Sequence, residues 1–157
     1  MIKIYCNDNL KDVLDDNDVE EYVPAYGGES AGLDLYNAGS DITIMPSSSN
    51  KKGGMISTGL HVFTPRGYVT LFKERGSITK TPLKYRAGVV DEGYTGEIFV
   101  NLHNVGTTAQ FIEPGQKIAQ GVFVRIEKPI LWEIGEDSIY GTETSRGSGA
   151  LGSTGDS

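Results

Sequence analysis

The amino-acid sequence predicts an all-β fold, either a sandwich or a barrel, and three observations support this. Short segments of β-type sequence recur along most of the chain, and each is bounded by Gly, Pro, Asn or Asp. Glycine makes up 21 of the 157 residues, about 13% against a usual ~7%, which indicates many tight turns. No stretch keeps a helical period beyond about three turns.

The expected strands, in chain order, are residues 2–5, 42–45, 59–63, 68–72, 96–102 and 118–124. Their apolar residues alternate with polar ones or form short runs, as strand residues do. Residues 47–54 (SSSNKKGG) are expected to form a flexible hairpin tip. The only helix candidate is 11–22 (KDVLDDNDVEEY), whose six carboxylates lack the spacing of a calcium loop. We therefore expect a solvated acidic loop or a short helix there.

Length and composition limit the classes of protein. The 157 residues predict one domain, which we place at 1–140, followed by a flexible Gly/Ser/Thr-rich tail at 141–157. The net charge of -7 disfavours binding to the phosphates of nucleic acid. Cys6 is the only cysteine, which excludes an intrachain disulfide and a Cys-ligated zinc site. The start resembles no signal peptide and no long apolar run follows, so we expect a soluble, cytoplasmic protein without membrane contact.

Four clusters of residues have the composition of a reactive or binding site. Residues 31–35 (AGLDL) place Asp34 between apolar residues. Residues 73–80 (KERGSITK) surround a Gly-Ser turn with cations, where backbone N–H groups and a guanidinium suit an anion. Residues 87–97 (AGVVDEGYTGE) predict a hairpin with a carboxylate and a Tyr near its turn, and 115–120 (GQKIAQ) enter a strand that carries a Gln. Taken alone, each polar residue also fits a turn cap, an ion pair, a surface charge or a strand side chain.

The order and spacing of these clusters, together with the tail, are similar to those of the trimeric dUTP pyrophosphatase (dUTPase) family. The five ordered motifs of that family match residues 31–35, 75–80, 88–97, 115–120 and 146–155. The resemblance covers about 125 residues, nearly everything after the acidic segment. It implies a distorted, jelly-roll-like β-barrel that forms a homotrimer with active sites at subunit interfaces. The implied activity is hydrolysis of dUTP to dUMP and pyrophosphate.

The resemblance implies roles for residues of the third motif. Asp91 would be the catalytic residue, orienting and deprotonating the water that attacks the α-phosphorus. Tyr94 would pack on the deoxyribose, and its bulk would leave no room for a ribose 2′-OH. The uracil edge would be read by backbone groups of the segment from Tyr85 to Val89, which includes Gly88.

The phosphates would be bound by residues of the second and fourth motifs. Arg75, the backbone at Gly76 and Ser77, and a polar contact from Gln120 would supply the site. Mg²⁺ would be carried mainly by the triphosphate and water, with Asp34 acting through water only. The order Gly76–Ser77 departs from the Ser-Gly order of the family and displaces the serine hydroxyl by one residue.

The tail would act as a lid that closes over the substrate and excludes water. Arg146 would reach the γ-phosphate, Gly152 would allow close approach of backbone amides, and Ser153 and Thr154 would add donors. Leu151 stands where the family has the aromatic residue that stacks on uracil. It would cover the base by apolar contact, so we expect activity with a weaker contribution from the lid.

Two alternatives to this function stay open. A dCTP deaminase shares the fold and part of the third motif, but it needs a general-base Glu where this chain has Asn101, whose amide cannot shuttle a proton. A dUTPase-like chain could instead be a nucleotide-responsive regulatory or binding module. A 5-modified dUTP is a further candidate substrate, and a viral origin would place the protein in the host cytoplasm.

Overall fold

The computed structural model describes residues 1–14, 28–49, 53–135 and 138. The chain divides into two units, Met1–Glu127 and Lys128–Ser157, and all of the named elements lie in the first. In chain order these elements are β1 (Lys3–Cys6), α1 (Asp8–Val13), β2 (Leu33–Tyr36), β3 (Ile42–Ile44), the 3₁₀ helix η1 (Ser47–Ser49), β4 (Gly54–Phe63), β5 (Tyr68–Lys73), the 3₁₀ helix η2 (Gly76–Lys80), β6 (Leu83–Arg86), β7 (Val89–Val90), β8 (Glu97–Asn104), β9 (Gln110–Ile112) and β10 (Lys117–Arg125).

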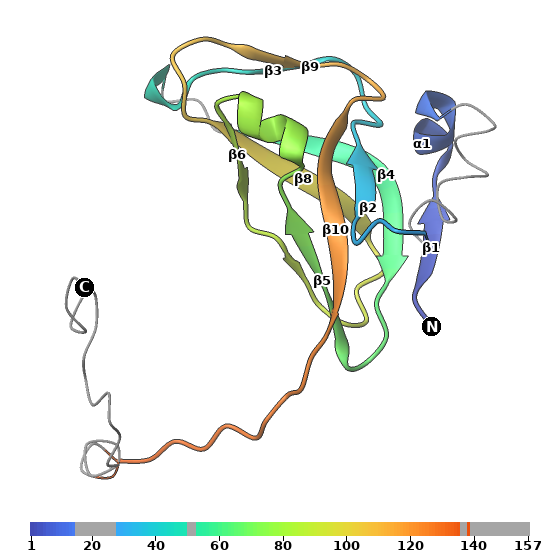
Figure 1. Ribbon diagram of the computed structural model, residues 1–157, viewed down its shortest axis with the longest axis vertical. Coiled ribbons are helices and arrows are strands. Elements are labelled where there is room, and N and C mark those ends of the chain that lie inside the picture. Colours follow the sequence, from blue (N-terminus) through green and yellow to red (C-terminus); the bar gives the residue numbers. More distant parts are fainter. Residues whose placement is uncertain (15–27, 50–52, 136–137, 139–157) are drawn as a thin grey trace. The chain divides into compact units, whose positions relative to one another are not determined.

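The strands form an all-β, jelly-roll-like fold, which confirms the predicted class. One four-stranded sheet has the order β1-β4-β8-β6, a second has the order β2-β10-β5-β7, and β3 pairs with β9 (Figure 1). Every strand pair is antiparallel. Neighbours in a sheet are mostly distant in sequence, so the chain crosses repeatedly between the sheets, as expected for double-sheet β folds.

The core lies between the sheets and follows the period of two that strands impose. In β8, Ile98, Val100 and Leu102 are at most 1% exposed, whereas Phe99 between them is 47% exposed. This alternation directs every second side chain inward. The buried residues of both sheets form one hydrophobic cluster, whose burial is the main stabilising contribution to a domain of this size.

All six predicted strands are present, with ends that differ by a few residues. The structure also contains β2, β6, β7 and β9, which the sequence pattern did not predict as strands. The prediction of a hairpin tip at 47–54 is wrong for its flanking strands, because β3 pairs with β9 and not with β4, and residues 50–52 lie outside the described residues. Ser47–Ser49 instead forms η1, and Gly54 already begins β4.

The helix candidate at 11–22 is partly correct. Helix α1 begins three residues earlier, at Asp8, because the Asn7 side chain caps it by accepting a hydrogen bond from the Leu10 N–H at 3.0 Å. Leu10 is fully buried and docks the helix on the core. The remainder of the acidic segment, from residue 15 onward, lies outside the described residues, as do the predicted domain boundary at 140 and the tail at 141–157.

No helix within the described ranges is long and apolar enough to cross a membrane.

Candidate active site

A pocket opens where β6 separates from β8. Their pairing runs from Leu83–Asn104 to Arg86–Asn101 and stops there, although β8 continues to Glu97. After Arg86 the chain turns away through Ala87 and Gly88 and enters β7, which pairs with β5 in the other sheet. A pocket of about 350 Å³ lies between the departing segment and β8, within the usual range for small-molecule sites.

Residues of the third motif converge on this pocket. Its lining includes Gly88, Val89, Asp91 and Tyr94, which the family resemblance assigned to catalysis and to binding of the nucleoside. The full lining is Met55, Phe72, Tyr85, Arg86, Ala87, Gly88, Val89, Val90, Asp91, Tyr94, Glu97, Ile98, Phe99 and Asn101. These residues form a mainly apolar wall with two carboxylates, Asp91 and Glu97, and one cation, Arg86, among them, a composition typical of ligand sites.

The turn at the pocket wall requires glycine at position 88. Gly88 has a φ of 132°, a conformation that residues with a side chain rarely adopt. A Cβ at this position would lie 2.7 Å from a ring carbon of Tyr85 and 3.1 Å from the backbone oxygen of Phe72. The Gly88 carbonyl also accepts a hydrogen bond from the Phe72 N–H at 2.7 Å. The backbone of the predicted uracil-reading segment is therefore fixed against β5.

Hydrogen bonds fix the turn that carries Asp91 and Tyr94. The Tyr94 N–H donates to the Asp91 carbonyl at 3.3 Å, and the Tyr94 hydroxyl donates to the Glu97 carbonyl at 2.9 Å. The Glu97 carboxylate accepts from the Gly59 N–H at 2.9 Å and from the Ser57 hydroxyl, which anchors the turn to β4. Asp91 itself is exposed, so its carboxylate is open to water and substrate.

Tyr85 gives the pocket an apolar wall over the physiological pH range. Its ring meets that of Phe72 edge-on, with the centroids 6.4 Å apart. Burial raises the pKa of Tyr85 to about 12, because the phenolate would lose solvation there. A tyrosine is neutral near pH 7 at its ordinary pKa of 10.0 as well, and the raised pKa extends this neutral range to higher pH.

The first, second and fourth motifs meet in a second group, which contains two cations. Asp34 Oδ1 lies 2.5 Å from Arg75 Nη1, and Asp34 Oδ2 lies 3.1 Å from Lys117 Nζ. Gln120 on β10 is in register with Asp34 on β2 and with Lys73 on β5. The hydrogen bond to Asp34 is the main cause of a raised Lys117 pKa, which keeps this ammonium charged.

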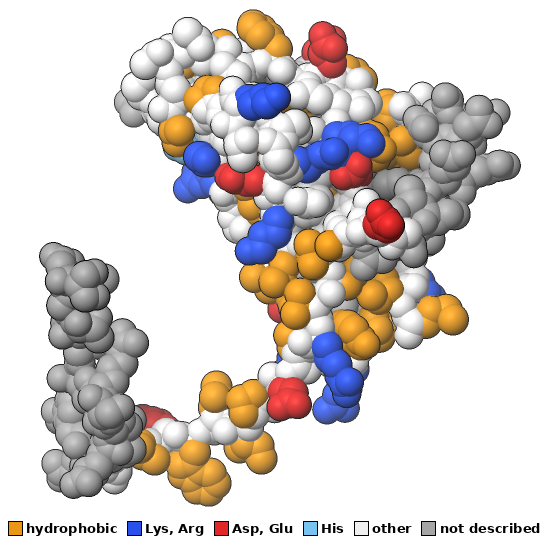
Figure 2. Space-filling view, viewed as in Figure 1, with side chains coloured by type: hydrophobic (Ala, Val, Ile, Leu, Met, Phe, Trp, Pro, Cys, Tyr) orange, Lys and Arg blue, Asp and Glu red, His pale blue; other side chains and the backbone are white. Residues whose placement is uncertain are grey.

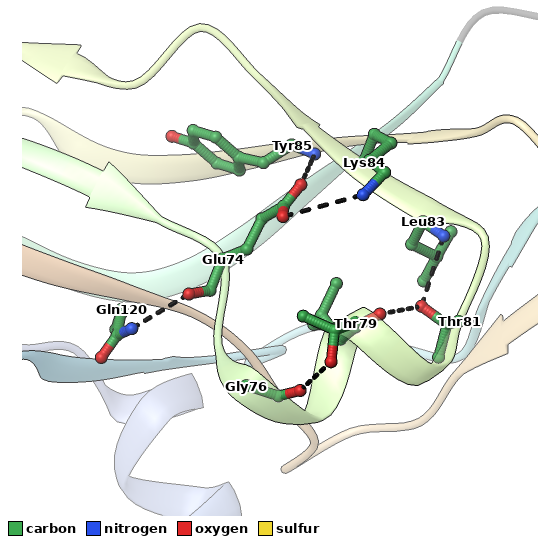
Figure 3. A network of polar contacts seen from close by, with 9 residues as sticks. Glu74, Gly76, Thr79, Thr81, Leu83, Lys84, Tyr85 and Gln120 are labelled. Atoms are coloured by element: carbon green, nitrogen blue, oxygen red, sulfur yellow. Dashed lines mark hydrogen bonds and ion pairs between the residues drawn. The ribbon is translucent and has the colours of Figure 1, made fainter. Parts of the chain in front are cut away.

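The turn expected to hold phosphate follows Arg75 directly. Gly76 and Ser77 open η2 and are both exposed. The Thr79 hydroxyl donates to the Gly76 carbonyl at 2.5 Å and fastens the turn (Figure 3). A Cβ at Gly76 would meet nothing within 4 Å, so there is open space beside the backbone in which an anion can lie.

Glu74 links the two groups, and the sequence analysis assigned it no role. Its carbonyl accepts from Gln120 Nε2 at 3.0 Å, while its carboxylate accepts from the Tyr85 N–H at 3.4 Å and faces Lys84 Nζ at 3.9 Å (Figure 3). Glu74 therefore connects the cationic turn to the start of the pocket wall. Its place in the cluster at 73–80, directly before the second motif, was the available signal, but its contacts depend on how the strands are paired.

The structure places most of the predicted site residues in these two groups. The pocket lining contains none of Asp34, Arg75, Gly76, Ser77 and Gln120, so the nucleoside group and the cationic group are separate parts of one chain. Arg146, Leu151, Gly152, Ser153 and Thr154 lie outside the described residues. Among the residues that are described, no three His, Cys, Asp or Glu side chains are placed to hold a metal ion together.

On this jelly-roll-like fold, an apolar pocket with an exposed carboxylate on its wall and a separate cationic turn suit a ligand that combines a flat ring with anionic groups, as a nucleotide does. The family model for dUTPase matches residues 22–155. Among curated proteins, the chain is 38% identical to the deoxyuridine 5'-triphosphate nucleotidohydrolase of Rickettsia akari over 138 residues, covering 85% of this chain and 88% of the relative. It is 36% identical to the protein of the same name from Dictyoglomus turgidum over 134 residues, covering 80% and 84% of the two chains.

Solved structures show the same fold. The dUTPase of Staphylococcus bacteriophage 80alpha, solved with dUPNHPP, superposes with a TM-score of 0.77 at 22% identity, over 99% of both chains. The dUTPase of phage phi11 of S. aureus superposes with a TM-score of 0.68 at 21% identity, over 87% of this chain and 97% of the other. This chain belongs to the dUTPase family.

Proposed function

We propose that this chain hydrolyses dUTP to dUMP and pyrophosphate, by in-line attack of water on the α-phosphorus. Membership of the dUTPase family and relatives named as deoxyuridine triphosphate nucleotidohydrolases support the activity. The observation that carries the mechanism is the exposed Asp91 carboxylate on the wall of a pocket of about 350 Å³. In this role Asp91 positions the attacking water and accepts its proton, the contribution of a general base.

The uracil base would lie beside β8, along the part of that strand with which β6 does not pair. Because β6 leaves β8 after the pair Arg86–Asn101, residues 97–100 of β8 have no β6 partner. The uracil edge would pair with backbone donors and acceptors there and at Gly88 and Val89, a pattern that cytosine does not complement. Tyr94 lies on the same pocket and would exclude a ribose 2′-hydroxyl by its bulk.

The triphosphate would lie against the cationic group. Arg75 offers a planar fork suited to phosphate, the backbone at Gly76 and Ser77 is exposed beside it, and Gln120 adds an amide. Ser77 takes the position after the glycine, so any hydroxyl contact comes from the second residue of η2.

Mg²⁺ fits this site as an ion carried by the substrate. Both Asp34 oxygens lie close to cations, and the described residues form no cluster of three metal ligands, so Asp34 would act through water only. The structure of a mutant phage phi11 dUTPase describes the coordination of a structural Mg(II) ion. When bound with the triphosphate, the ion would neutralise phosphate charge.

A homotrimer with interfacial active sites accounts for exposed apolar surface. Ile130 and Leu131 are each 90% exposed and Trp132 is 83% exposed. Figure 2 shows hydrophobic side chains uncovered along the segment that follows β10. Contiguous exposed apolar side chains usually mark a protein interface. The separation of the nucleoside group from the cationic group on one chain also suits an active site completed by a neighbouring subunit.

We further propose that the chain consists of a barrel domain at 1–140 and a lid at 141–157. Arg146 would bind the γ-phosphate, Ser153 and Thr154 would add donors beside Gly152, and Leu151 would cover the base. Closure would exclude water that competes with the positioned nucleophile.

The comparisons give no support to the alternative functions. The position at which a deaminase needs Glu is Asn101 on β8, and its amide cannot act as a general base. A purely regulatory role would not require an exposed carboxylate on the pocket wall. The cytoplasmic location stays a prediction.

Pyrophosphate release tests the substrate and the lid together. With Mg²⁺ present, we expect release from dUTP and little from dCTP, UTP or dTTP. A chain that ends at Thr144 should release pyrophosphate from dUTP at least about tenfold more slowly, because it loses the charged hydrogen bonds of Arg146, worth about 1.5–3 kcal/mol, together with the weaker apolar cover that Leu151 would give the base. No release from any of the four nucleotides, with dUTP still bound, would favour the regulatory alternative. An unchanged rate after truncation would disprove the lid.

A further inference from the structure

We propose that Lys117 is a positioning residue for triphosphate binding: it neutralises one oxygen of Asp34 so that Arg75 keeps donors for the phosphates. The inference rests on the proposed role of Arg75. The family resemblance assigned no role to Lys117, which lies within the fourth motif.

The two oxygens of the Asp34 carboxylate contact different cations. Asp34 Oδ1 faces Arg75 Nη1 at 2.5 Å, and Oδ2 faces Lys117 Nζ at 3.1 Å. The Asp34 and Arg75 side chains are each 26% exposed, whereas Lys117 is 47% exposed. The first pair is thus partly shielded from water, and electrostatic interactions there are stronger than on an open surface.

Lys117 changes the net charge that the Asp34–Arg75 pair presents to an anion. With Lys117, one carboxylate is balanced by two cations, and the group has a net charge of about +1. Without it, Asp34 and Arg75 form a neutral pair. Both carboxylate oxygens would then be available to the guanidinium, which prefers a bidentate arrangement with carboxylates. Arg75 would turn toward Asp34 and withdraw donors from the phosphate.

The fold holds Lys117 in this position. It pairs with Tyr36 across β10 and β2, and the register shifts between Lys117 and Ala119. Irregularities of this kind redirect side chains. The Lys117 ammonium also lies 5.4 Å from the centre of the Tyr36 ring, a cation–π arrangement that keeps it beside Asp34.

The test compares Lys117→Met with Lys11→Met by calorimetric binding of dUPNHPP and by dUTP hydrolysis. Lys11 is a matched control, since it is also 47% exposed, lies 3.5 Å from Asp8 and stands 5.8 Å from the Tyr5 ring. For Lys117→Met we expect a rise of about tenfold in Kd and KM, with kcat within about twofold. Lys11→Met should leave Kd, KM and kcat within about twofold of the unmodified chain. Lys117→Arg keeps the positive charge and should have the Kd of the unmodified chain.

A second background separates positioning from direct contact. In Asp34→Asn, the further change Lys117→Met should raise Kd less than about threefold, because no carboxylate then competes for Arg75. A persistent tenfold effect would mean that Lys117 touches the phosphates itself and would overturn the proposal, as would equal Kd values for the two lysine variants. Absence of dUTP hydrolysis by the unmodified chain would instead overturn the proposed function, while the Kd comparison would still decide the role of Lys117.

Discussion

Replacing Asp91 with Asn is expected to lower kcat for dUTP by about 10²- to 10⁴-fold, with KM within about threefold. The amide keeps the size of the carboxylate but cannot accept the proton of the attacking water, and general bases contribute rate factors of that order. The side chain is exposed, and the turn is held through the Asp91 backbone carbonyl, so the fold should persist. Steady-state kinetics with dUTP and Mg²⁺, together with circular dichroism, measure both properties.

The adjacent acid provides the control for this prediction. The Glu92 carboxylate accepts a hydrogen bond from the Gly67 N–H at 2.7 Å, and the amide oxygen of Glu92→Gln can accept the same bond. We expect its kcat within about threefold of the unmodified chain. If Asp91→Asn behaved like Glu92→Gln, the general base would have to be another group.

Replacing Asn104 with Ala is expected to lower the free energy of unfolding by about 3–5 kcal/mol. Asn104 is fully buried. Its Nδ2 donates to the carbonyls of Ile44 at 2.9 Å and Thr108 at 2.8 Å, and its Oδ1 accepts from the Gly106 N–H at 2.9 Å. Alanine would leave these backbone groups unpaired, and each buried unpaired group costs about 1–3 kcal/mol.

Asn101 on the same strand is the matched comparison. Among the described residues, its Oδ1 is buried without a hydrogen-bond partner, so Asn101→Ala removes no hydrogen bond of that oxygen seen there and should change the free energy of unfolding by less than about 1 kcal/mol. Urea unfolding followed by circular dichroism gives both values. Equal losses for the two variants would contradict the assignment of this stability to the Asn104 amide.

Strands with a clear local pattern could be predicted, whereas strands defined by their partners could not. β8 alternates Ile98, Val100 and Leu102 inward, and this period is visible without a structure. β6 (LKYR) buries only Leu83, and β7 has two residues. Both are strands because they pair with β8 and β5, an interaction between distant segments that a local window does not contain.

The site residues were likewise only partly predictable from the sequence. The family resemblance of the third motif singled out Asp91 and Tyr94, and the structure places both on one pocket. It did not assign roles to Glu74 or Lys117, because their contacts arise from the alignment of β10 with β2 and from the return of the chain into β6. Residue type and spacing therefore locate a reactive group, but the residues that orient it depend on strand register.

The extended segment after β10 also fixes what tryptophan fluorescence can report. Trp132 is the only tryptophan in the chain, and it is 83% exposed, in the unit that begins at Lys128. Its emission senses the surroundings of that segment. In the proposed homotrimer, covering of the indole by a neighbouring subunit would shift the emission to shorter wavelength, so fluorescence of this single tryptophan would report association.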